Sequence, residues 1–256
     1  MLRSIIISAF LASFSNISYS LELNQRVEIL ARSFPIGGFS KYTLELIKPL
    51  WGEKDHVRDI TYGFFGAQAE FRTSVIVNYI AVRGFVYPLP ILGIFAGAES
   101  GIKKIRNIDT FNCDQFLCDG KMKREYIGLK LALGHKKFFF MSENKYSQLT
   151  PDMENRLFVD EITTLLGTPK GDNTFVSLNI VGLRYSDHQK FGLIFLSNRM
   201  KKNKSQTEML NFFYEHSWKQ HSLISSAGIF ETRQRQKVAT LLFLYSWKTP
   251  SSLRLF

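Results

Sequence analysis

After its first twenty residues the chain has no apolar run of about 18 residues, the length that a helix needs to cross a bilayer. This absence argues against a helical membrane protein. The sequence also lacks a nucleotide-binding loop, a zinc motif and a pair of catalytic carboxylates, so it predicts no cofactor and no metal. What it has in abundance is aromatic residues, 23 Phe and 10 Tyr, which favour β-strands.

Apolar and polar side chains alternate along several segments, which is the period of a β-strand. One face of the segment 124–134 is apolar and carries Ile127, Leu129, Leu131 and Leu133. The other face carries Tyr126, Gly128, Lys130, Ala132 and Gly134. In the segment 175–180, Val176, Leu178 and Ile180 face one way, and Ser177 and Asn179 face the other. We interpret the first pattern as a strand with one face toward lipid.

The same kind of pattern predicts twelve strands, which we place at 25–34, 40–50, 59–67, 73–83, 91–100, 124–134, 137–146, 175–185, 190–199, 209–218, 221–231 and 237–247. In the second half of the chain, short and long connections alternate. The connections at 134–136, 186–189 and 219–220 are short, whereas 101–123 and 147–174 are long. Short turns on one side of the membrane and long loops on the other are typical of a transmembrane antiparallel β-barrel, here with about 12 strands (10–12).

The first twenty residues have the pattern of an export signal. Arg3 gives a positive start, residues 5–12 form a short apolar core, and Ser18-Tyr19-Ser20 offers small residues before a cleavage site. A short anchor helix is the alternative. We therefore expect a signal peptide at 1–20 and a barrel domain at 21–256.

The chain ends in Phe256, preceded at alternate positions by apolar residues, although Pro250 interrupts the segment. Together with the Arg3–Ser20 segment, the strand alternation and the loop pattern, this ending resembles that of bacterial outer-membrane β-barrels. The resemblance implies an outer-membrane location and insertion by the barrel-assembly machinery. It implies no activity. An exported soluble barrel that binds an apolar ligand, similar to a lipocalin, remains an alternative.

Cys113 and Cys118 are the only cysteines, and in an oxidising compartment we expect them to form a local disulfide. Free thiols are the alternative, and a metal site would need more soft ligands. The net charge is +11. For an exported chain this charge favours anionic lipids and lipopolysaccharide as partners over nucleic acid. The basic residues that we expect to contact lipopolysaccharide are Lys103, Lys104, Arg106, Arg199, Lys201, Lys202 and Lys204.

Inside the barrel, the residues expected to face the lumen are Lys130, Glu143 and Glu215. In the long connection 147–174, Thr150 and Asp152 are good helix caps, so we expect a short helix near 151–166. This connection either packs on itself outside the barrel or folds inward as a plug of the lumen.

The weak candidates for catalysis are His216, Ser217, His221 and Ser222. A His and a Ser can perform nucleophilic hydrolysis, as in barrel-type phospholipases and lipid A deacylases. Here, however, each His is adjacent to its Ser, so the two point to opposite faces of one strand. The sequence therefore favours a small passive pore or a structural surface protein over a lipid-modifying enzyme.

Overall fold

The computed structural model describes residues 21–51, 62–74, 76–105, 111–152 and 156–249. The expected signal peptide at 1–20 and the terminal Phe256 lie outside the described residues. Among the described residues, no helix is long and apolar enough to cross a membrane.

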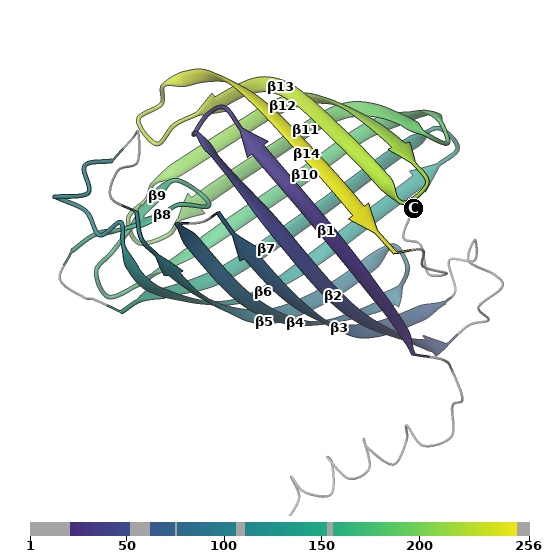
Figure 1. Cartoon of the computed structure of the whole chain (residues 1–256), viewed down its shortest axis with the longest axis horizontal. Coiled ribbons are helices and arrows are strands. Elements are labelled where there is room, and N and C mark those ends of the chain that lie inside the picture. The colour runs from purple at the N-terminus through teal and green to yellow at the C-terminus, as the bar shows by residue number, and fades with distance from the viewer. Residues whose placement is uncertain (1–20, 52–61, 75, 106–110, 153–155, 250–256) are drawn as a thin grey trace, which may run out of the picture.

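Twelve long antiparallel strands close into one barrel (Figure 1). Around the wall their order is β1, β14, β13, β12, β11, β10, β7, β6, β5, β4, β3 and β2. Their bounds are β1 (Glu22–Arg32), β2 (Gly37–Trp51), β3 (Gly63–Thr73), β4 (Val77–Leu89), β5 (Leu92–Lys103), β6 (Gly120–His135), β7 (Phe138–Pro151), β10 (Asp172–Ser186), β11 (Gln189–Met200), β12 (Gln206–Trp218), β13 (His221–Glu231) and β14 (Lys237–Lys248). The predicted fold class and the strand number are confirmed.

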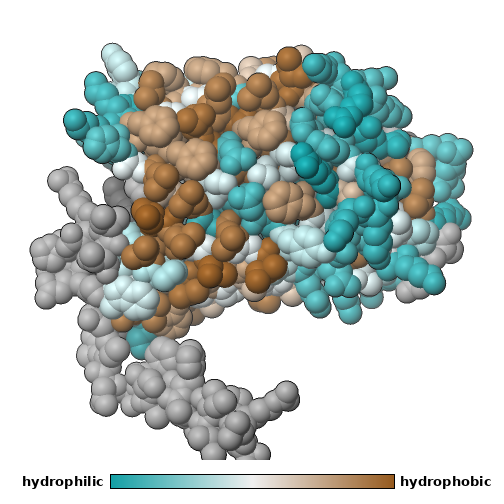
Figure 2. All heavy atoms as spheres, turned by 180° about the vertical axis from the view of Figure 1, so that it is seen from behind, coloured by the Kyte–Doolittle hydropathy of each residue, from teal (hydrophilic) through white to brown (hydrophobic). Residues whose placement is uncertain are grey.

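The outer face of the barrel carries an apolar belt. On β6 the side chains of Ile127 and Leu129 are 56% and 52% exposed, while Arg124 and Met122 on the other face are buried. Figure 2 shows the belt as brown side chains on the left half of the barrel in that view, and a mostly polar, teal surface on the right half. Every strand of the barrel is paired on both sides, so no backbone edge of the wall is left open to lipid. The closed ladder and the belt together are the architecture of a transmembrane β-barrel.

In the second half of the chain the connections sort by length between the two ends, as predicted. At the end where β1 begins and β14 stops, β6–β7, β10–β11 and β12–β13 are each joined by two residues. At the opposite end, β5–β6 and β7–β10 are joined by the long segments 104–119 and 152–171. By the usual orientation of such barrels, the short turns are periplasmic and the long loops are external.

The expected helix near 151–166 is wrong for the residues that the structure describes. Residues 153–155 lie outside them, and beyond that gap the chain forms a small hairpin of β8 (Phe158–Asp160) and β9 (Leu165–Gly167). Phe158, Val159 and Leu165 are all 0–1% exposed, so consecutive side chains are buried on both faces. A one-sided helical stripe does not provide that burial, and the packing of the hairpin outweighs the capping residues that suggested a helix.

Candidate functional site: a capped lumen

The lumen has one strongly charged side, formed by β1 to β7. Lys41 on β2 lies 2.5 Å from Glu28 on the neighbouring β1, and Arg72 on β3 lies 3.5 Å from Glu99 on β5, with β4 between them. The expected lumen residues Lys130 and Glu143 face each other in register on β6 and β7. Glu215, the third expected lumen residue, lies on β12 and pairs with Lys190 at 3.2 Å. Such a lining is wetted by water and suits the passage of polar solutes.

The β8–β9 hairpin folds into the external mouth of the barrel and is fixed to the charged side (Figure 1). Arg124 on β6 donates a hydrogen bond of 2.6 Å to Asp160, and the same guanidinium lies 3.0 Å from Glu99 on β5. Lys103 on β5 donates to the Val159 carbonyl at 2.6 Å. These are charge-assisted contacts in a buried place, where they are strongest.

The next hairpin residue, Glu161, accepts a hydrogen bond of 2.6 Å from the Tyr79 hydroxyl on β4. Its other carboxylate oxygen lies 3.4 Å from Lys103. Three adjacent strands, β4, β5 and β6, therefore hold one side of the hairpin.

The other side of the hairpin is bonded to the opposite part of the wall. Thr207 on β12 donates a hydrogen bond of 3.0 Å to the Thr163 carbonyl. Asn203, in the connection between β11 and β12, donates to the Leu166 carbonyl at 2.8 Å. Between β6 and β12 the wall order places β7, β10 and β11. The hairpin thus spans the mouth as a bridge, and of the two expectations for this connection the structure shows the inward fold.

Asp160 is the central ionisable group of this cap. Burial favours its neutral form, but Arg124 and a hydrogen bond of 2.6 Å from Thr163 outweigh this effect and lower the pKa of the Asp160 carboxyl below its ordinary value. The carboxylate is therefore ionised at neutral pH. The attachment of the hairpin depends on this charge.

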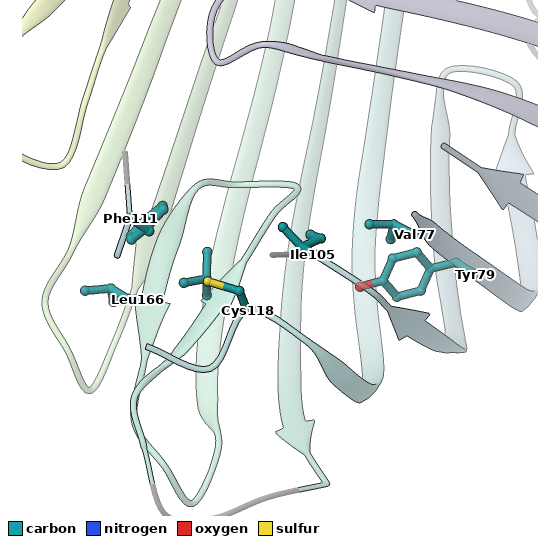
Figure 3. Close-up of a cluster of buried hydrophobic side chains, with 7 residues drawn as sticks. Val77, Tyr79, Ile105, Phe111, Cys118 and Leu166 are labelled. Carbon is teal, nitrogen blue, oxygen red and sulfur yellow. The ribbon is translucent and has the colours of Figure 1, made fainter. Parts of the chain in front are cut away.

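The neighbouring loop, 104–119, packs against the cap. A disulfide joins Cys113 to Cys118, and the bridge lies in an apolar cluster with Val77, Ile105, Phe111 and Leu166 (Figure 3). Two backbone hydrogen bonds connect Leu117 with Leu157 and Val159, at 2.8 and 3.0 Å. The small disulfide loop therefore supports the hairpin from one side.

The basic residues expected to contact lipopolysaccharide do not form one set. Lys103 differs from the expectation, because it is 2% exposed and faces the hairpin inside the mouth. Arg106 lies outside the described residues. The remaining five are exposed at the external end: Lys104, Arg199, Lys201, Lys202 and Lys204.

The structure does not join the expected His and Ser candidates into a catalytic pair. His221 stacks on Trp218 and lies 2.7 Å from the Tyr245 hydroxyl, in an aromatic group on the outer face near the periplasmic end. Ser217 points the other way and donates a hydrogen bond of 3.0 Å to Glu215 in the lumen. His216 stacks on Trp218, and Ser222 lies opposite Ser217 in register. This arrangement does not favour hydrolysis of lipid.

Sequence reasoning missed Arg124, Asp160 and Tyr79, which hold the cap, and it assigned Lys103 to another role. Arg124 shares the parity of Lys130 on one strand, so alternation alone was sufficient to place it in the lumen. Asp160 and Tyr79 carry no comparable signal, because their partners are far apart in the chain.

No protein-family model matches this chain, and no curated protein does. Among solved structures, a NanC porin is similar, with 11% identity, a TM-score of 0.47, and coverage of 90% of this chain and 100% of that chain. A KdgM porin has 8% identity, a TM-score of 0.44, and coverage of 88% and 98%. The β domain of the Bordetella autotransporter BrkA has 11% identity, a TM-score of 0.42, and coverage of 90% and 99%. These values are too low to transfer the role of any residue.

Proposed function

We propose that this barrel is a narrow, passive pore of the bacterial outer membrane whose external mouth is restricted by the β8–β9 hairpin. The apolar belt suits the bilayer, and the charged side of the lumen suits polar solutes. The observation that carries the proposal is the hydrogen bonding of one hairpin to β4, β5 and β6 on one side and to β12 on the other. A hairpin held in this way narrows the lumen without any change in the wall.

The partners follow from the same location. Export by residues 1–20 and insertion by the barrel-assembly machinery, which the Phe256 ending suggests, would deliver the chain to the outer membrane. Exposed basic side chains at the external end, among them Lys104, Arg199 and Lys201, would meet lipopolysaccharide phosphates. Titrating the protein in detergent with lipopolysaccharide would test this contact, and a variant with these three changed to Gln should bind less.

Single-channel recording in planar bilayers tests the pore directly. We expect a small conductance in potassium chloride for the intact protein. A variant in which 158–167 is replaced by a short Gly-Ser linker should conduct more, because the bridge across the mouth is removed. Heat-modifiable migration on gels would show that both proteins form the barrel.

A structural surface protein is the second candidate, and the depth at which the hairpin is buried favours it. Phe158 and Leu165 are both 0% exposed, so the cap is packed like a core. If the intact protein and the linker variant are both silent in bilayers although the barrel is folded, the pore is excluded and the surface protein stands.

A further inference from the structure

The lumen also has an apolar surface, on β10 and β11. On β10, Phe175, Val181 and Leu183 are exposed on the outer face, so the residues of opposite parity point inward. In register, Leu178 lies opposite Leu196 and Ile180 lies opposite Ile194. These four side chains make a continuous apolar wall inside the barrel. A pore that passes only hydrophilic solutes has no use for such a wall.

This apolar wall is not covered by the rest of the chain. All four side chains are half-buried, and none belongs to the three buried hydrophobic clusters of the described residues. Met209 on β12 lies opposite Leu196 in register, and Phe230 on β13 lies opposite Met209. By contrast with the wall, these two side chains are packed and only 5% and 2% exposed. The wall therefore meets the water of the lumen. Apolar surface in such a place gains free energy when a ligand covers it.

Cations border the wall on its β7 side. Lys145 on β7 lies opposite Val176, which is two residues before Leu178 on β10. On β6, the strand beyond β7, Lys130 lies opposite Glu143. Neither lysine forms an ion pair with a carboxylate of the described chain. Glu143 lies opposite Leu178 on one side and opposite Lys130 on the other, so one carboxylate stands beside two lysines and the three groups together carry a charge of +1. Lys145 stands 5.2 Å from the centre of the Tyr126 ring, so an aromatic face lies beside its ammonium.

We propose that the lumen binds a small amphiphilic anion, with its carboxylate at Lys145 and its apolar body along Leu178, Leu196, Ile180 and Ile194. From β7 to β11 the wall covers two strand spacings, about 10 Å, which matches an acyl chain of roughly eight carbons or an aromatic ring with a short tail. The inference rests on the proposed pore, because it names the class of solute that the pore selects.

Octanoate is the probe, and acetate is its matched control with the same head group and no tail. Covering one side of the six additional methylenes should make octanoate bind on the order of 50-fold more tightly than acetate. Binding is read in two ways on the full-length protein. One is the reduction of potassium chloride current in planar bilayers, and the other is equilibrium dialysis of labelled octanoate in detergent.

Three variants separate the head from the tail. Lys145→Gln should weaken octanoate and acetate alike, each about tenfold, and leave the ratio of the two affinities unchanged. The double variant Leu178→Thr with Ile194→Thr should weaken octanoate about tenfold and leave acetate unchanged. Leu242→Thr makes one such change in the lumen on β14, away from β10 and β11, and should have no effect. Heat-modifiable migration shows that each variant is folded.

The outcomes distinguish this inference from the pore itself. Equal affinity for octanoate and acetate would overturn the inference, and so would an equal loss of octanoate affinity in the Leu178/Ile194 double variant and in Leu242→Thr. In either case a potassium chloride current would still support a pore. A silent channel that binds octanoate in dialysis and loses it in the double variant overturns the pore and leaves the binding site standing.

Discussion

Replacing Asp160 by Asn should release the hairpin from the mouth of the barrel. The carboxylate of Asp160 accepts one hydrogen bond from Arg124 and one from Thr163, both at 2.6 Å. The side chains of Asp160 and Arg124 are 1% and 3% exposed, so their charges have almost no access to water. Removing one partner of a buried pair costs about 3–5 kcal/mol. Asn keeps the shape and one acceptor, so we expect the lower value, about 3 kcal/mol, or roughly a hundredfold in the ratio of docked to undocked hairpin.

Hydrogen exchange of two hairpin amides measures this ratio. The Val159 amide donates to Leu117, and the Thr164 amide donates to the Asp160 carbonyl, at 3.0 and 2.7 Å. Both should exchange roughly a hundredfold faster in Asp160→Asn, while amides of the barrel strands keep their protection. Glu231→Gln is the control, because its carboxylate lies 2.7 Å from the exposed Arg235, in a contact that solvent screens.

Unchanged exchange of Val159 and Thr164 in Asp160→Asn would refute the reasoning. It would mean that apolar packing alone holds the hairpin and that the network of Arg124 and Glu99 is incidental. Faster exchange throughout the barrel would refute it in another way, because the substitution would then have weakened the fold and not the cap.

Further predictions concern the same cap. Because the pKa of Asp160 is lowered, the stability that its carboxylate gives to hairpin docking is complete above its ordinary pKa of 3.8 and is lost as the pH falls through the lowered pKa. Channel current should therefore rise only on strong acidification. A rise in current at alkaline pH would contradict this. Replacing Cys113 and Cys118 by Ser removes a constraint worth about 2 kcal/mol for so short a loop, so the hairpin amides should exchange faster while gel migration of the barrel stays heat-modifiable. A Cβ at Gly101 would lie 2.2 Å from the Tyr79 ring, so Gly101→Ala should displace that ring and raise the channel current, whereas an unaltered current would show that Tyr79 is dispensable for closure.

The barrel itself could be predicted from the sequence because its signal is local. Alternation along 124–134 reports which side chains share a face, and the lengths of the connections report which end they occupy. The cap could not be predicted in this way. Asp160 and Arg124 are 36 residues apart, and Thr163 and Thr207 are 44 apart, so only the closed wall brings them together. The helix expected near 151–166 failed for the same reason, since local capping signals do not report burial by distant strands.

Alternation reports that two faces differ, but it does not report which face is outside. On β6 the apolar face meets lipid, whereas on β10 the apolar residues Leu178 and Ile180 face the lumen and Ser177 and Asn179 face outward. The outward pair is tolerated in the belt because Asn179 donates a hydrogen bond of 3.1 Å to Ser177, which satisfies polar groups that lipid cannot.

The direction of β10 is instead fixed by its ends. Asp172 and Thr174 are 1% and 2% exposed inside the external mouth, where Asp172 accepts hydrogen bonds from the backbone of Lys202 and Asn203. Since the strand period is two, an inward Asp172 forces Leu178 and Ile180 inward as well. The inward direction of these side chains is therefore a consequence of how the strand is anchored. The sequence has Leu and Ile at those positions, where Ser or Thr would suit a purely aqueous channel.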